Sequence, residues 1–183
     1  PEPELTKVDN KSEEESIFTS VSAALSHRNL LFGIIAIFLY VGVEVGIPNF
    51  TNLYITSPEI GINVTTAGAI VGMYWFLMLC GRLLGGVVGA KVSSKTMVAS
   101  AAVLAAGFLI TGILLKNSFQ VNFPAITKDL SISLEKIPVG VMFFILCGLC
   151  TSVMWGAIFN LAVQGLGKLT SIASGLFMVM VCG

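Results

Sequence analysis

The sequence of 183 residues is 55% hydrophobic and only 11% charged, and its formal net charge is zero. Soluble globular domains carry about 25% charged residues, so this composition argues against bulk water as the main solvent of the chain. Zero net charge also argues against nucleic acid as a partner. We therefore expect an all-α fold, a polytopic transmembrane helix bundle surrounded by membrane lipid.

The N-terminal segment is the most polar part of the chain. Eight of the 20 charged residues lie in the first 15 positions, and residues 1–16 lack the apolar core of a secretory signal. Ser12 and Glu15 have the spacing of a capping box. Apolar residues then recur at every fourth position, at Ile17, Val21 and Leu25. We expect residues 1–28 to be a cytoplasmic segment with a short amphipathic helix, over 12–28, that lies on the membrane surface.

Residues 29–183 form the predicted transmembrane domain. A helix needs roughly 20 apolar residues to cross a hydrocarbon core about 30 Å thick. Four segments meet this requirement, at 30–55, 66–90, 96–115 and 139–164. A fifth, truncated span covers 171–183, and because the sequence ends inside this apolar run we expect a fragment of a longer protein.

Basic residues in the loops predict the orientation of the spans. They flank the start of the first span and follow the second and fourth, at His27, Arg28, Lys91, Lys95 and Lys168, and three more in the long 116–137 loop, Lys116, Lys128 and Lys136, weaken the bias. The 56–64 loop has neither Lys nor Arg. The positive-inside rule then places the N-terminus and the 91–95 and 165–170 loops in the cytoplasm. The long 116–137 loop is too polar to span, and the sequence leaves open whether it holds a short hairpin.

Glu44 lies near the middle of the first span and is the most informative residue. A charged side chain there costs about 2.5–3.5 kcal/mol on insertion scales, and such residues face a bundle interior or a water-filled cavity. Because low dielectric disfavours the charged form, we expect Glu44 to be neutral, or hydrogen-bonded to polar groups, when the site is empty. The alternative is a structural role, in which a neighbouring helix satisfies a protonated Glu44.

Other polar residues share the helix face of Glu44. The residues at this spacing of four are Tyr40, Glu44, Pro48 and Asn52, and Asn49 lies beside them. Pro48 removes a helical hydrogen bond and can kink the span. Hydroxyl, carboxylate and amide groups beside an aromatic ring suit a neutral polyol such as a sugar. The alternative for either Asn is hydrogen bonding between helices.

Spans two and four carry further candidates. Polar or aromatic residues gather in span four at Thr151, Ser152, Trp155 and Asn160, and in span two at Tyr74 and Trp75. We predict that Trp75, Trp155 and Asn160 line a substrate cavity, although an aromatic at this depth is more often a packing residue. Gly81, Gly85 and Gly89 recur every four positions, which lets helix backbones approach closely. Arg82 can reach the interface, or Gly81 and Arg82 form a contact on the gate side that breaks during transport.

We expect no catalytic centre, no metal and no cofactor in this chain. Cys147 and Cys150 form a C-x-x-C, but no His or acidic residue lies near them in sequence. Both cysteines therefore fit small buried apolar residues. His27, which is predicted at the interface, is the single histidine, and this argues against an intramembrane enzyme.

Three stretches resemble the fucose/glucose/galactose:proton symporters of the major facilitator superfamily. FLYVGVEVGIPNFTNLYI is similar to their seventh span, and MYWFLMLCGRLLGG to their eighth. CGLCTSVMWGAIFNLAVQGLGKLTSIASGLFMVMVCG is similar to their tenth span, cytoplasmic turn and eleventh span. The most specific residues are Gly165, Gly167, Thr170, Ser174 and Gly175. The resemblance covers about residues 28–183, except the 116–137 loop, which departs from the family pattern.

The resemblance implies spans seven to eleven of twelve, the C-terminal half of a bacterial inner-membrane transporter. It implies alternating access by two six-helix halves, with the sugar between them. Proton-coupling acids are expected mainly in the N-terminal half, which is absent here. Family members vary at the position of Glu44, some having an amide, and this favours sugar contact over obligate proton coupling. The alternatives are a facilitator of another small polar solute or drug, and a non-transporting membrane sensor on the same fold.

Overall fold

The computed structural model describes residues 10–115, 119–126 and 131–182 as a bundle of helices with one β-hairpin. The elements in chain order are α1 (Asn10–Leu25), α2 (Arg28–Ile55), α3 (Val64–Gly89), α4 (Ser94–Leu114), β1 (Gln120–Ile126), β2 (Ile132–Pro138), α5 (Val139–Val163), the short η1 (Gly167–Leu169) and α6 (Thr170–Cys182). In the described part, α2, α3, α4 and α5 are long and apolar enough to cross a membrane.

The ends of the helices are set by capping side chains and by glycines in the turns. Asn63 caps α3, because its side-chain oxygen accepts from the Thr65 N–H at 2.9 Å. Ser93 caps α4 in the same way, accepting from the Thr96 N–H at 3.3 Å. These side chains satisfy backbone donors that have no partner inside the helix. Gly165, with φ 86°, takes a left-handed conformation just after α5 ends, which other residues rarely adopt.

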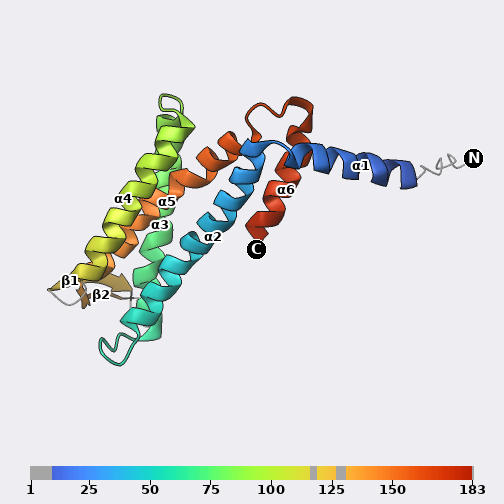
Figure 1. The fold of residues 1–183 in the computed structure, drawn as a ribbon. Helices are drawn as coiled ribbons and strands as arrows, with labels where there is room; N and C mark the ends of the chain where they lie inside the picture. Colours follow the sequence, from blue (N-terminus) through green and yellow to red (C-terminus); the bar gives the residue numbers. More distant parts are fainter. Residues whose placement is uncertain (1–9, 116–118, 127–130, 183) are drawn as a thin grey trace, which may run out of the picture.

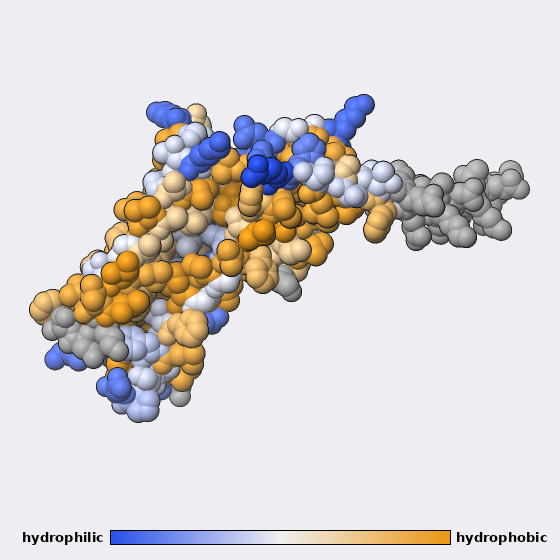
Figure 2. Space-filling view, viewed as in Figure 1, coloured by the Kyte–Doolittle hydropathy of each residue, from blue (hydrophilic) through white to orange (hydrophobic). Residues whose placement is uncertain are grey.

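The bundle has two ends, separated by an apolar band. Figure 1 shows α1, the α3–α4 loop and the α5–α6 loop at one end, here called the α1 end. The β-hairpin and the α2–α3 loop lie at the other, called the hairpin end. In Figure 2 hydrophilic residues gather at both ends and hydrophobic residues cover the surface between them. This distribution is what a chain that crosses a bilayer requires.

Helix α5 is the central helix, and small residues let its neighbours approach it. A Cβ added to Gly33 of α2 would overlap Ala162 of α5, and one added to Gly81 of α3 would overlap Ser152. Gly148 of α5 meets the backbone carbonyl of Tyr74 on α3. Without the glycines, α2 and α3 could not lie this close to α5. The spacing of glycines on span two therefore serves helix contact in this structure.

The 116–137 loop contains the β-hairpin that the sequence left open. Strands β1 and β2 pair antiparallel, from Gln120 opposite Pro138 to Ile126 opposite Ile132. Alternate residues face the bundle, and Ala125 and Ile137 are buried against a cluster that includes Ile55 at the end of α2. The hairpin thus caps the hairpin end of α2, α3 and α5.

Candidate functional site

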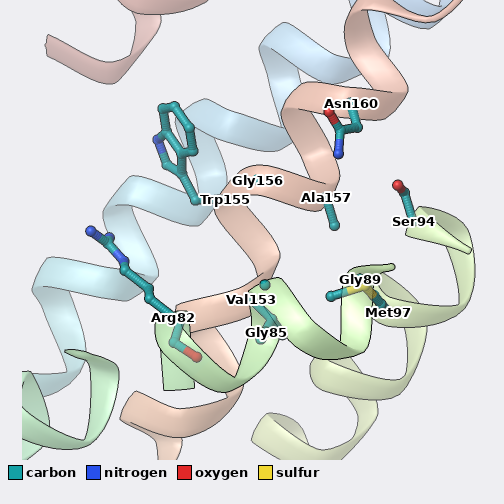
Figure 3. Close-up of a pocket in the computed structure, with 12 residues that line it drawn as sticks. Arg82, Gly85, Gly89, Ser94, Met97, Val153, Trp155, Gly156, Ala157 and Asn160 are labelled. Atoms are coloured by element: carbon teal, nitrogen blue, oxygen red, sulfur yellow. The ribbon is translucent and has the colours of Figure 1, made fainter. Parts of the chain in front are cut away.

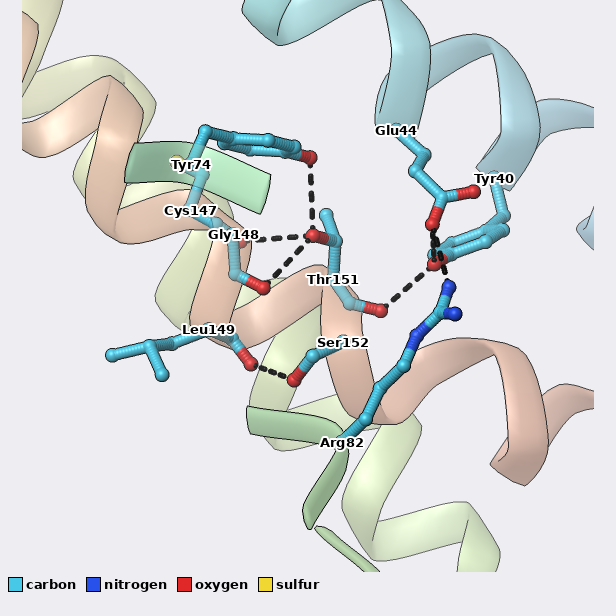
Figure 4. A network of polar contacts seen from close by, with 9 residues as sticks. All are labelled: Tyr40, Glu44, Tyr74, Arg82, Cys147, Gly148, Leu149, Thr151 and Ser152. Carbon is cyan, nitrogen blue, oxygen red and sulfur yellow. Dashed lines mark hydrogen bonds and ion pairs between the residues drawn. The ribbon is translucent and has the colours of Figure 1, made fainter. Parts of the chain in front are cut away.

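A polar network occupies the middle of the apolar band, centred on Glu44. The Glu44 Oε1 accepts a hydrogen bond from the Tyr40 hydroxyl at 2.9 Å. The same oxygen forms an ion pair with Nη2 of Arg82, on α3, at 3.1 Å (Figure 4). The Glu44 side chain is 12% exposed and that of Arg82 52%. Glu44 is therefore paired with a residue of opposite charge, as ionisable residues within membranes usually are.

The Glu44–Arg82 pair was not predicted from the sequence. The two interpretations of Arg82 were a side chain that reaches the interface and a contact on the gate side. The two residues lie 38 positions apart on different spans, so no local pattern joins them. The expectation that Glu44 is hydrogen-bonded to polar groups describes what the structure shows, and its bond to Tyr40 follows the predicted spacing of four.

Tyr40 connects Glu44 to the central helix. Its hydroxyl also donates to the Thr151 carbonyl oxygen on α5, at 2.9 Å. A phenol has one hydrogen, so Tyr40 shares it between this carbonyl and Glu44. On the other side of α5, the Tyr74 hydroxyl lies 3.1 Å from Thr151 Oγ1. Tyr40, Tyr74 and Thr151 are all buried, so the network joins α2, α3 and α5 inside the bundle.

Tyr74 and Thr151 are network residues that the sequence analysis named but did not place in the site. Thr151 Oγ1 also donates toward the Cys147 and Gly148 carbonyl oxygens of its own helix, at 3.1 and 3.2 Å. Such bonds from Thr to the preceding turn are ordinary in helices and give no signal in the sequence. Their place in the site follows only from the packing of α3 on α5.

Beside this network lies a cavity of about 530 Å³ between α3, α4 and α5 (Figure 3). The residues that line it are Arg82, Gly85, Gly86, Gly89, Ser94, Met97, Ser152, Val153, Trp155, Gly156, Ala157 and Asn160. Small-molecule sites usually have volumes of about 300–1,000 Å³ and a few placed polar groups. Arg82 belongs both to the cavity and to the network. The glycines of α3 leave room that side chains would otherwise fill.

Trp155 is held at the cavity by other aromatic residues. Its ring stacks on Phe159 with centroids 5.9 Å apart, and it meets Phe177 of α6 edge-on at 6.0 Å. Trp75 instead packs edge-on against Tyr74 at 5.4 Å, is 45% exposed, and does not line the 530 Å³ cavity. The two tryptophans predicted to line a cavity therefore occupy different places.

The remaining predicted residues of α2 lie apart from the cavity. Asn49 is exposed, and Asn52 lies two turns beyond Glu44 with its Oδ1 buried and without a hydrogen-bond partner in the described part of the chain. Pro48 is buried inside α2. Because proline has no N–H, the helical hydrogen bond to the Glu44 carbonyl is missing. The structure thus gathers Tyr40, Glu44 and Arg82 in the network, and Arg82, Trp155 and Asn160 at the cavity.

The four cysteines form no disulfide in the described part of the chain. Cys147 and Cys150 are free and buried in α5, and the Cys147 thiol donates to the Phe143 carbonyl oxygen at 3.3 Å. Within residues 10–115, 119–126 and 131–182, no three His, Cys, Asp or Glu side chains come together as metal ligands would.

Comparisons with known proteins give consistent results. The model of the Major Facilitator Superfamily matches residues 1–183. Two proteins named "Glucose/galactose transporter", from Brucella abortus strains 9-941 and 2308, are each 28% identical over 162 residues, which is 88% of this chain and 34% of theirs. A Helicobacter pylori 26695 protein, provisionally named as a glucose/galactose transporter, is 27% identical over 179 residues, 98% of this chain and 39% of its own.

These curated relatives are much longer than the region they share with this sequence. The chain spans between 34% and 39% of their length. No solved structure matches the chain at a significant level.

Proposed function

The chain belongs to the Major Facilitator Superfamily, and from this premise we propose that it is part of one half of a secondary active transporter for a neutral sugar. The superfamily match and relatives named as glucose/galactose transporters support this proposal. In it the chain supplies spans seven to eleven, works as a transporter and not as an enzyme, and lies in a bacterial inner membrane. The α1 end, with Arg28, Lys91, Lys95 and Lys168, faces the cytoplasm.

One observation carries the choice of substrate. The 530 Å³ cavity is lined by a hydroxyl, an amide and an indole, from Ser152, Asn160 and Trp155, and Arg82 on its wall is neutralised by Glu44. Hydroxyl and amide groups both donate and accept hydrogen bonds, as sugar hydroxyls do. The Ser152 hydroxyl already donates to the Leu149 carbonyl oxygen, but an apolar solute would cover the Asn160 amide and the Trp155 N–H without giving them partners, at a cost of about 1–3 kcal/mol for each group.

The proposed mechanism is alternating access, coupled to protons. In transporters of this superfamily two halves rock around a site near the middle of the membrane. This chain contributes one wall of that site, through Glu44, Arg82 and the cavity beside them. The opposite half completes the site and supplies most of the proton-coupling acids. Contacts among α2, α3 and α5 through Tyr40, Tyr74 and Thr151 favour movement of this wall as a unit.

Uptake of radiolabelled glucose, galactose and fucose by the full-length transporter tests the proposal. We expect saturable uptake that other neutral hexoses inhibit. In the proposal Glu44 also bonds a sugar hydroxyl, so Glu44→Ala should lower sugar affinity by about one to two decades. Glu44→Gln keeps the shape and an acceptor oxygen, and should largely keep binding. If no neutral sugar competes for uptake, the substrate class is another small polar solute or a drug, and this proposal fails.

The two tryptophans provide a matched comparison for the cavity. Trp155→Ala should raise the apparent Kd for the sugar, because Trp155 lines the 530 Å³ cavity. Trp75→Ala makes the same change on α3, outside that cavity, and should leave the Kd within about twofold, an effect below roughly 0.5 kcal/mol. Binding that weakens only in Trp75→Ala would move the site away from the cavity described here.

Proton coupling is tested by the same Glu44 variants. If Glu44 carries the coupled proton, Glu44→Gln should keep exchange of sugar across the membrane but abolish accumulation driven by a pH gradient. We expect accumulation to persist in Glu44→Gln, because the proposed coupling acids lie in the opposite half. If Glu44→Ala matches the parent in both binding and accumulation, Glu44 is structural.

A further inference from the structure

Arg82 is the strongest positive group on the cavity wall. Its side chain is half exposed, lines the 530 Å³ cavity, and pairs with Glu44 at 3.1 Å. A guanidinium carries five N–H donors in a planar fork that matches a carboxylate. Glu44 accepts from one of its nitrogens, Nη2. An uncompensated Arg82 would therefore be a ready binding group for an anionic ligand.

Glu44 is held more firmly than Arg82. It is 12% exposed, compared with 52% for Arg82, and its Oε1 also accepts from the Tyr40 hydroxyl. Tyr40 is in turn buried and bonded to the Thr151 carbonyl oxygen of α5. Figure 4 shows the Glu44 carboxylate, the Tyr40 hydroxyl and the tip of Arg82 gathered at one point between α2 and α5. The carboxylate is thus a fixed countercharge for the guanidinium.

We infer that Glu44 sets substrate selectivity by masking Arg82, so that the site accepts neutral sugars and rejects sugar acids. This inference rests on the proposed sugar transport and assigns a specificity role within it. A hexuronate, which has a carboxylate where a hexose has a hydroxymethyl group, would meet an arginine that is already paired. The carboxylate of the hexuronate would also lie close to the carboxylate of Glu44, and two negative charges that share one arginine repel each other.

Removal of the Glu44 charge should admit the sugar acid. In Glu44→Gln the amide stays close to Tyr40 and Arg82 but no longer neutralises the guanidinium. Arg82 can then bind a carboxylate through two parallel hydrogen bonds, which are stronger than neutral ones. A bond to a charged group is worth enough to change affinity about ten- to hundredfold.

The experiment measures inhibition of labelled galactose uptake by galacturonate and by unlabelled galactose in the full-length transporter. In the parent we expect galactose to inhibit far better than galacturonate. In Glu44→Gln the ratio of the two inhibition constants should shift at least about tenfold toward galacturonate. The double variant Glu44→Gln/Arg82→Gln should lose this gain. Glu59→Gln removes a carboxylate from the α2–α3 loop, outside the network, and should not change the ratio.

Three results would overturn the inference. They are a parent that binds galacturonate as well as galactose, a Glu44→Gln variant with no gain, and a gain that persists without Arg82. Thermal stabilisation of the purified proteins by galacturonate provides a second measurement that does not need transport. If the parent carries no neutral sugar, the proposed function fails, but stabilisation of Glu44→Gln alone would still support masking. If Glu44→Gln does not fold, Glu44→Ala removes the same charge, and the inhibition constant of galacturonate itself should then fall below its value in the parent.

Discussion

Gly148→Ala is the sharpest test of how the helices around the site are packed. An added Cβ would overlap the backbone carbonyl oxygen of Tyr74 and lie 3.2 Å from its carbonyl carbon. A backbone group cannot rotate away, so α3 would have to move from α5. Overpacking of this kind costs about 1–3 kcal/mol. Alanine gains about 0.5–1 kcal/mol over glycine within a helix, so we expect the free energy of unfolding to fall by about 1 kcal/mol, and by no more than about 2.5 kcal/mol.

Gly156→Ala is the matched control on the same helix. No atom lies within 4 Å of its added Cβ, so this variant should be neutral or more stable by up to about 1 kcal/mol. The propensity change is the same in both variants, and their difference therefore isolates the contact with Tyr74. Thermal denaturation of the purified full-length protein in detergent measures it. Equal stability of the two variants would refute the close approach of α3 to α5.

Gly148→Ala should also change the geometry of the polar network around Glu44. Tyr74 bonds through its hydroxyl to Thr151, one turn beyond Gly148 on α5, at 3.1 Å. A displaced α3 would carry both Tyr74 and Arg82 away from their partners. We therefore expect Gly148→Ala to weaken hexose binding as well as stability. Because Gly156 lines the cavity, the control for binding is Gly68→Ala on α3, where no atom lies within 4 Å of the added Cβ and which does not line the cavity.

Three further predictions concern the network, the hairpin and the chain as a whole. Tyr40→Phe removes the hydroxyl shared by Glu44 and Thr151, and should lower the free energy of unfolding by about 1 kcal/mol; an unchanged Tm would contradict the network. Ile137→Ala should lower the free energy of unfolding by about 2–5 kcal/mol, because Ile137 is fully buried. Ile132 is 78% exposed, so Ile132→Ala should leave the Tm unchanged, and thermal denaturation compares the two variants. The 183 residues alone, reconstituted in liposomes, should give no saturable sugar flux, since the proposal assigns the opposite wall of the site to a second half of the transporter.

The spans were predictable because their cause is local. The hydrocarbon core sets a minimum length of apolar helix, and that length can be counted along the chain. The first span was predicted at 30–55 and α2 is Arg28–Ile55; the fourth was predicted at 139–164 and α5 is Val139–Val163. The hairpin could not be settled in the same way, because β1 and β2 are stabilised by burial of Ala125 and Ile137 against other helices.

The site was predictable only in part. Glu44 could be singled out because its depth in the span can be counted along the chain and a carboxylate at that depth is costly. Tyr40 could be named because residues four apart in a helix are neighbours. The place of Tyr74 and Thr151 in the network could not be predicted from the sequence. Hydroxyl groups are common in membrane helices, and these two residues bond each other from different spans.

The sequence by itself therefore determined the number and placement of the apolar spans, and it singled out Glu44, the residue at the centre of the polar network. Only the tertiary structure decided which partner Glu44 takes, and which tryptophan lines the cavity. Both depend on the rotation and separation of α2 and α3 against α5. Those are set by contacts between distant residues, such as Gly81 with Ser152 and Gly148 with Tyr74. No spacing within one helix records how closely another helix approaches it.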